Sequence, residues 1–177
     1  MDNFEHCLSI TLKWEGGYSN HPDDPGGPTM KGVIQKEYDA WRKKHGLRTQ
    51  PVKRISETEL RAIYRAEYWD AMKCGDLPDG VDLCVFDAAV NSGVGRAKKW
   101  AAQTDAANIQ VPEEHIIDAY CDTRLAFLQR LGHLWRVFGA GWRRRVQGIR
   151  AQAHVMNAHP HAATPWKAHG EPEENHK

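Results

Sequence analysis

Apolar residues recur every three to four positions along several segments of the chain, with little of the strict alternation that is typical of strands. This periodicity predicts a series of amphipathic helices. The first is expected to begin behind a capping Asp2, to carry an apolar side from Phe4 to Leu12, and to end at the glycine Gly16. Glu15 then falls on its last turn.

Six further helices are predicted downstream, which makes the chain all-α (mainly α) with about seven helices. Ser56 and Glu59 form a capping box at the start of one of them, and Pro112 opens a long one. The last shows a clean apolar stripe at offsets 0, 4, 7, 11 and 14 from Trp142. The predicted ranges are 34–45, 56–69, 81–91, 96–107, 112–131 and 142–156.

The segment 16–32 interrupts this pattern with three prolines and five glycines, too many for a helix, and predicts a long irregular loop. Glu15 precedes it, and Asp23, Asp24 and Thr29 lie within it. A carboxyl group at a helix end that faces a second carboxylate across a loop is what glycoside hydrolysis requires: one protonates the leaving oxygen and the other stays ionised. The alternative is that Asp23 and Asp24 only form turns beside prolines.

Composition and charge narrow the choice of partner. The 177 residues, 41% hydrophobic and 27% charged, suit one soluble domain. Residues 1–122 carry a net charge of −5, whereas residues 123–170 hold eight basic residues and no acid. This asymmetry predicts an anionic partner or surface, with nucleic acid, the headgroups of an anionic membrane and the bacterial cell wall as the candidates. Arg143, Arg144, Arg145 and Arg150 are expected to point toward solvent beside the inward stripe of the last helix.

Several other kinds of site are not expected. The four cysteines are scattered without CxxC spacing, which predicts reduced thiols, and the histidines near the C-terminus have no companion acids or cysteines that would complete a metal site. No dinucleotide or phosphate-binding motif is present, so no cofactor is predicted. The N-terminus lacks the basic start and long apolar run of a signal peptide, so we expect synthesis in the cytoplasm.

The string Glu15-Gly-Gly-Tyr18, Asp23-Asp24-Pro-Gly-Gly-Pro-Thr29, Lys31-Gly32-Val33 resembles the signature of the glycoside hydrolase family 108 N-acetylmuramidases, lysozyme-like enzymes of bacteria and phages. Later landmarks are similar in the same order: Tyr68-Trp69, the stretch 86–93, and the segment 124–146, which resembles the family's predicted peptidoglycan-binding portion. The resemblance implies a lysozyme-like helical globule with its active-site loop after the first helix.

The same resemblance implies roles for individual residues. Glu15 matches the essential glutamate of the family, and Asp24, or alternatively Asp23, would be the second carboxylate. Thr29 would complete a Glu, Asp, Thr triad similar to that of phage lysozymes, although only four residues separate it from Asp24 where five are usual. Ile34 stands where the family tends to have threonine. Binding of substrate would fall to Tyr18, Asp23, Asn91 and Ser92.

These observations leave three hypotheses. The first is a monomeric peptidoglycan hydrolase that cleaves between N-acetylmuramic acid and N-acetylglucosamine, as a phage endolysin released through a holin or a bacterial enzyme with dedicated export. The second is a peptidoglycan-binding protein with weak or lost catalysis. The third, a nucleic-acid binder, is disfavoured by the acidic first half and by the absence of a base-reading motif. The expected division is a catalytic part at 1–94, a binding-like part at 95–157 and a tail at 158–177.

Overall fold

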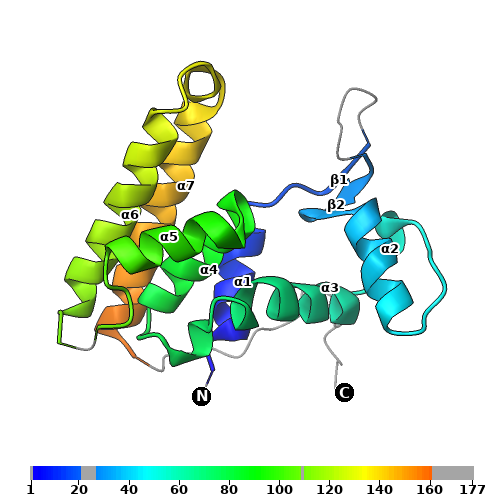
Figure 1. Cartoon of the computed structure of the whole chain (residues 1–177), viewed down its shortest axis with the longest axis horizontal. Helices are drawn as coiled ribbons and strands as arrows, with labels where there is room; N and C mark the ends of the chain where they lie inside the picture. Colours follow the sequence, from blue (N-terminus) through cyan, green and yellow to red (C-terminus); the bar gives the residue numbers. More distant parts are fainter. Residues whose placement is uncertain (1, 21–26, 109, 161–177) are drawn as a thin grey trace, which may run out of the picture.

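The computed structural model describes residues 2–20, 27–108 and 110–160, and helices make up most of these ranges, as predicted (Figure 1). Seven α-helices lie within the described residues. Their bounds are Phe4–Leu12 for α1, Gln35–Lys44 for α2, Glu57–Tyr64 for α3, Val81–Ser92 for α4, Val94–Gln103 for α5, Glu113–Gln129 for α6 and His133–Ala158 for α7.

Of the two predicted caps, the one at Ser56 is confirmed, whereas the N-cap of α1 is Asn3 and not Asp2. The Asp2 carboxylate accepts a hydrogen bond of 2.8 Å from the backbone N–H of Phe4. Ser56 and Glu59 form the reciprocal capping box of α3, in which each side chain bonds the other residue's backbone N–H. Beyond α3 the chain continues as a π-helical segment, Arg65–Asp70, and short 3-10 turns occupy Val52–Arg54 and Cys74–Asp76.

A small antiparallel sheet, which the apolar pattern did not predict, lies in and beside the glycine-rich segment. Its strands are β1 (Tyr18–Ser19), β2 (Thr29–Met30) and β3 (Val33–Ile34), in the order β1-β2-β3. Strands of two residues are too short to show a period of two. The β2–β3 turn consists of Lys31 and Gly32, both with positive φ, which is the conformation of the tight turns that match strand twist.

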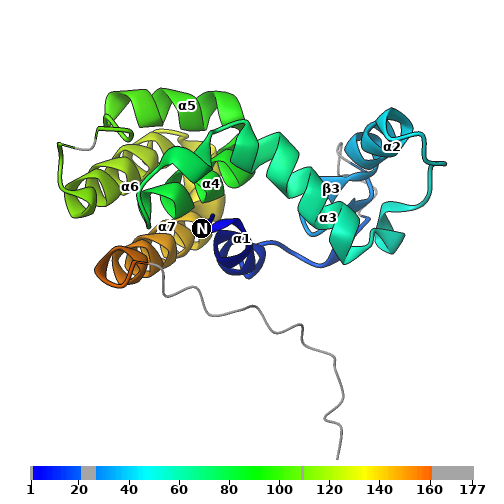
Figure 2. The same ribbon diagram turned by 90° about the horizontal axis from the view of Figure 1, so that it is seen from below.

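The helices form two groups joined by α3 and the π-helical segment. Figure 1 shows α1, α4, α5, α6 and α7 together on one side and α2 with the small sheet on the other. Figure 2 shows α3 running from one group to the other. The side of the molecule that holds α2 and the sheet is called the small lobe below.

Helix α4 lies at the centre of the larger group, and every residue from Val81 to Ala89 is buried. Phe86 packs edge-on against Phe4 and Trp69, with ring centroids 6.0 and 5.4 Å apart. All four cysteines are free and buried, in agreement with the prediction of reduced thiols. No described helix has the length and apolar character to cross a membrane.

Helix α7 begins nine residues earlier than the stripe at Trp142 predicted. Its lower part is as expected, because Val146, Ile149, Ala153 and Met156 are buried. The upper part was missed because Gly139 and Gly141 lower the helix propensity of that stretch.

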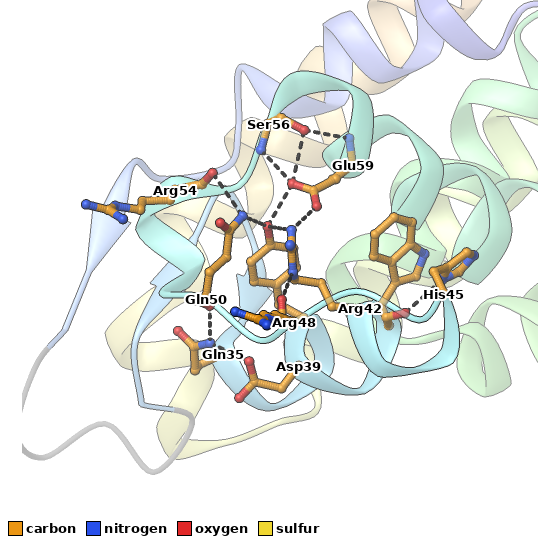
Figure 3. Close-up of polar contacts among 11 residues, drawn as sticks. Gln35, Asp39, Arg42, His45, Arg48, Gln50, Arg54, Ser56 and Glu59 are labelled. Atoms are coloured by element: carbon orange, nitrogen blue, oxygen red, sulfur yellow. Dashed lines mark hydrogen bonds and ion pairs between the residues drawn. The ribbon is translucent and has the colours of Figure 1, made fainter.

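A polar network fixes α2 of the small lobe against the start of α3 (Figure 3). The Tyr38 hydroxyl donates to Glu59 at 2.7 Å, Arg42 forms an ion pair with Glu59, and the backbone N–H of Val52 donates to Gln35 at 2.6 Å. Burial would raise the pKa of Glu59, but the hydrogen bonds from Tyr38 and Ser56 and the charge of Arg42 lower it below its ordinary value. The network therefore holds α2 against the 3-10 turn at Val52 and the start of α3.

Candidate active site

Glu15 lies in the turn that ends α1, where the two groups of helices meet. Its backbone N–H donates to the carbonyl of Leu12 at 3.3 Å, which continues the helical winding past the last residue of α1. The side chain is 15% exposed, so a solvent-borne molecule can reach it although most of it is covered. The expected end of the first helix was therefore wrong by three residues: α1 ends at Leu12, and Glu15 lies in the turn that follows it instead of on its last turn.

One oxygen of this carboxylate is held by a residue of the last helix. Nη2 of Arg145 donates to Oε1 of Glu15 at 2.8 Å, and the same nitrogen donates to Oδ1 of Asp87 at 2.8 Å. The side chain of Arg145 is only 8% exposed. The prediction that Arg145 points to solvent is therefore wrong: at this position of α7 the guanidinium faces inward because two carboxylates are there to receive it.

Asp87 of α4 is the centre of a buried charge network. It is fully buried and accepts hydrogen bonds from Nε and Nη2 of Arg145 and from Nη1 of Arg124, which is 1% exposed. Burial would raise the pKa of Asp87, but the two guanidinium groups lower it. Arg124 also donates to Oδ1 of Asn91 at 2.9 Å. Helices α4, α6 and α7 together therefore fix the position of Glu15.

The β2–β3 turn closes over the other oxygen of Glu15. A Cβ atom built on Gly32 would lie 3.0 Å from Oε2 of Glu15 and 2.8 Å from the hydroxyl of Tyr64. That hydroxyl donates to the carbonyl of Lys31 at 2.7 Å. Both the positive φ of Gly32 and the lack of room beside it require glycine. The turn, Tyr64 and Glu15 are therefore in direct contact.

A pocket of about 370 Å³ opens between α2, the end of α3 and the start of α5. Tyr68 belongs both to this pocket and to the surroundings of Glu15: burial, then the charges of Glu37 and Glu15, raise the pKa of Tyr68 to about 12. Two of the side chains that line the pocket, Trp41 and Tyr68, are aromatic. Its lining residues are Glu37, Ala40, Trp41, Lys44, Ile63, Glu67, Tyr68 and Val94.

The other predicted site residues that the structure describes do not line this pocket. Thr29 lies in β2, pairs with Ser19 and Ile34, and donates to the carbonyl of Gly27 at 3.0 Å. Tyr18 of β1 is 42% exposed, and Nζ of Lys53 lies 5.1 Å from its ring centroid.

Asn91 and Ser92 end α4 directly before Val94, which lines the pocket, although the Asn91 oxygen is already bonded to Arg124. Asp23 and Asp24 lie outside the described residues. No cluster of metal-ligating side chains occurs in the parts of the chain that the structure describes.

Comparison with known proteins agrees with this geometry. The family model described as Glycosyl hydrolase 108 matches residues 8–93, which include Glu15, Gly32, Tyr64 and Asp87. A solved structure titled "Structure of Brucella abortus SagA" is similar with a TM-score of 0.73 and 33% identity, over 88% of this chain and 95% of that chain. None of the curated protein sequences compared with the chain matches it.

The fold and the site define a lysozyme-like helical protein with a carboxylate between two groups of helices. The chain belongs to glycosyl hydrolase family 108, so it is a glycoside hydrolase. Arg145 and Arg124 lie outside the matched range, yet both belong to the network that holds Glu15.

Sequence reasoning missed three contributors to the site: Arg145, Tyr64 and the role of Asp87. Asp87 lies in a stretch that only the family resemblance singled out, Arg145 was expected to point to solvent, and Tyr64 falls at an apolar helix position. Aspartates in an otherwise apolar helix, as at 82 and 87 of the segment 81–90, are a signal that could have found Asp87, because a buried carboxylate requires hydrogen bonds or a cationic partner. Nothing in one sequence identifies which arginine that partner is.

Proposed function

We propose that the protein is a peptidoglycan hydrolase of the N-acetylmuramidase type, which cleaves the bond between N-acetylmuramic acid and N-acetylglucosamine. The observation that supports it most is the setting of Glu15. Its carboxyl group is partly exposed, accepts a hydrogen bond from Arg145 and lies against the turn at Gly32. Membership of glycosyl hydrolase family 108 supplies the class of reaction.

In this proposal Glu15 is the general acid. Arg145 binds Oε1, and the protonated carboxyl group would pass its proton to the oxygen of the leaving sugar. The fixed contacts restrict rotation of the carboxyl group, which keeps that proton aimed at the scissile bond. Asp87 and Arg124 do not touch the substrate and act as positioning residues.

The second carboxylate is assigned to Asp24, or alternatively Asp23, and Thr29 is assigned to the same site. Asp24 would activate the attacking water, which predicts inversion at the anomeric carbon. Proton magnetic resonance of the freshly released product distinguishes inversion from retention. Tyr18 and the Asn91–Ser92 turn are proposed to contact sugars at the rim, and the pocket at Tyr68 and Trp41 to receive the continuing glycan.

The product tests the proposed bond. Purified peptidoglycan digested with the protein should yield muropeptides with ordinary reducing N-acetylmuramic acid ends in a mass spectrum, because water is the acceptor. Reducing N-acetylglucosamine ends would show cleavage of the other glycosidic bond. Anhydro-muramic products would show a transglycosylase, and either result would refute the N-acetylmuramidase assignment.

The biological setting is also a proposal. The chain would be made in the cytoplasm and would act on the cell wall after release through a holin or by dedicated export, as a monomer without a cofactor. Wall lysis by the protein added outside cells with a permeabilised outer membrane would match this setting. Absence of lysis by a protein that digests purified peptidoglycan would count against it.

A further inference from the structure

The first two turns of α7 expose three large apolar side chains. Leu134, Val137 and Phe138 are 47%, 56% and 52% exposed. Positions i, i+3 and i+4 lie on one side of a helix, so the three side chains form a continuous apolar strip. Large apolar side chains that gather on one exposed helix face indicate an interaction site rather than ordinary surface.

Arginines without a carboxylate partner lie on the same part of the α6–α7 hairpin, with Arg144 on the side of the strip and Arg136 and Arg143 on other sides of the helix. Arg130, Arg136, Arg143 and Arg144 have no carboxylate partner among the described residues, and no acidic residue occurs between 123 and 160. The other arginines of this stretch differ, because Arg124 and Arg145 bind Asp87 and Arg150 binds Asp122. The apolar strip and these four arginines are called the hairpin face below.

The hairpin face is located where α6 and α7 meet, at the end that stands clear of the other helices in Figure 1. An aromatic cluster supports it: the ring centroid of Trp142 lies 5.7 Å from that of Phe138 and 6.4 Å from that of Trp135, and Arg143 lies over the Trp135 ring at 5.4 Å. The apolar strip is therefore held on a rigid helix end.

We infer that the hairpin face binds the surface of an anionic phospholipid membrane. Leu134, Val137 and Phe138 would enter the boundary between the lipid headgroups and the acyl chains. The arginines of the hairpin face would bind lipid phosphates. Trp135 and Trp142 would lie at the level of the headgroups, where amphipathic rings are favoured. Charge complementarity selects this partner. The inference does not depend on the proposed reaction, because none of these residues contacts Glu15.

A second copy of the chain is a poorer occupant. Symmetric contact through this face would bring arginines of the same charge together without any acid to separate them. Three side chains that expose about half of their surface also offer on the order of 300 Å², against roughly 800 Å² per partner in a stable dimer.

The chain contains a matched pair of positions for the test. Val137 and Val155 are both 56% exposed and both lie on α7. Val155 follows Val137 by 18 positions, which equal about five turns of helix, so the two side chains point in the same direction from the helix axis. Val137→Glu places a carboxylate in the hairpin face, whereas Val155→Glu places the same carboxylate at the other end of the helix.

The experiment is co-sedimentation of the full chain with vesicles of phosphatidylglycerol and phosphatidylethanolamine, compared with phosphatidylcholine vesicles. Wild type and Val155→Glu should bind the anionic vesicles and not the neutral ones. Val137→Glu should lower the partition coefficient at least tenfold. Equal binding of the two variants, or no preference of wild type for anionic vesicles, would overturn the inference.

A second pair of variants tests the arginines. The double variant Arg136→Gln/Arg144→Gln should bind the anionic vesicles about 25-fold more weakly than wild type. Each basic residue near such a surface contributes about fivefold, or roughly 1 kcal/mol. Exposed cations of the small lobe, Lys43→Gln with Arg48→Gln, provide the control. The two valine variants and the two double variants should all hydrolyse soluble glycan fragments at the wild-type rate. If Val137→Glu instead lowers hydrolysis and leaves vesicle binding intact, the face belongs to the substrate and the membrane proposal is wrong.

Discussion

Arg145 and Glu15 are 130 residues apart in sequence, and Nη2 of Arg145 donates a 2.8 Å hydrogen bond to Oε1 of Glu15. The same guanidinium binds Asp87, which is fully buried. The carboxylate at the end of the first helix is thus held by the last helix through the central one. An enzyme that depends on the direction of one carboxyl group requires this kind of support.

Removing the guanidinium should therefore affect catalysis more than substrate affinity. Arg145→Gln is expected to lower kcat about 10- to 100-fold with little change in KM, because Glu15 loses its fixed orientation. Arg145→Lys should recover part of the rate, since it restores one donor. Steady-state hydrolysis of soluble glycan fragments measures both constants. An unchanged kcat for Arg145→Gln would remove Arg145 from the site.

Asp87→Asn tests the network as a source of stability. It leaves Arg124 and Arg145 buried with weaker partners and should lower the free energy of unfolding by about 3–5 kcal/mol. Glu15→Gln should cost far less, because Arg145 keeps Asp87. Chemical denaturation of the two variants gives the comparison. Similar losses in both would mean that Asp87 is not the centre of the network.

Gly32 offers a test of the turn above Glu15. Gly32→Ala combines a strained positive φ with a Cβ at 2.8 Å from the Tyr64 hydroxyl and 3.0 Å from Glu15. Gly46→Ala has a similar φ of +69° but no atom within 4 Å, so it measures the backbone strain alone. Gly46→Ala should lose about 1 kcal/mol of stability, and Gly32→Ala should lose more than that and should also lose activity. Full activity in Gly32→Ala would separate the turn from the site.

Substitution by alanine at two glycines of α7 should have different effects on the stability of the protein. Gly141 has open space around a built Cβ, so Gly141→Ala should stabilise the protein by about 0.5–1 kcal/mol through helix propensity. At Gly148 the same Cβ would lie 2.5 Å from Cζ2 of Trp14, the residue before Glu15. Gly148→Ala should give no gain and should change the Trp14 fluorescence. Equal gains in thermal denaturation would contradict the packing of Trp14 on α7.

Asp82 gives the stability a dependence on pH. Burial raises its pKa from 3.8 to about 6, although hydrogen bonds from Asn3, Gly80 and Leu83 lower it. Because the folded pKa is the higher one, the stabilisation is complete below about pH 4 and is lost as the pH rises through 6, a change of roughly 3 kcal/mol. Asp82→Asn should lack this component when the two unfolding free energies are compared from pH 4 to 7.5. Parallel curves would contradict the raised pKa.

The sequence predicted the helices best where apolar spacing and caps agreed. Ser56 with Glu59 marks the start of α3, and the stripe from Val146 to Met156 marks the buried side of α7. The sheet was missed because pairs such as Thr29–Met30 carry no periodicity, and their pairing depends on the Lys31–Gly32 turn. Local pattern determines helices, whereas short strands depend on contacts made elsewhere.

The candidate site was predictable only in part for a similar reason. Glu15 follows from its place at a helix end beside a glycine-rich loop, together with the family resemblance. Arg145 lies in a run of three arginines that looks like a solvated surface. Its inward direction depends on where Asp87 and Glu15 meet in space, and contacts over 58 and 130 residues leave no local trace.

The role of Glu15 is tested most directly by the release of reducing sugar from purified peptidoglycan. Glu15→Gln keeps the size of the side chain and removes the transferable proton, so the rate should fall at least about a hundredfold while the fold is retained. Glu114→Gln, an exposed glutamate on the first turn of α6, should keep the wild-type rate. A folded Glu15→Gln protein that releases reducing sugar at the wild-type rate would contradict the assignment of Glu15 as the general acid.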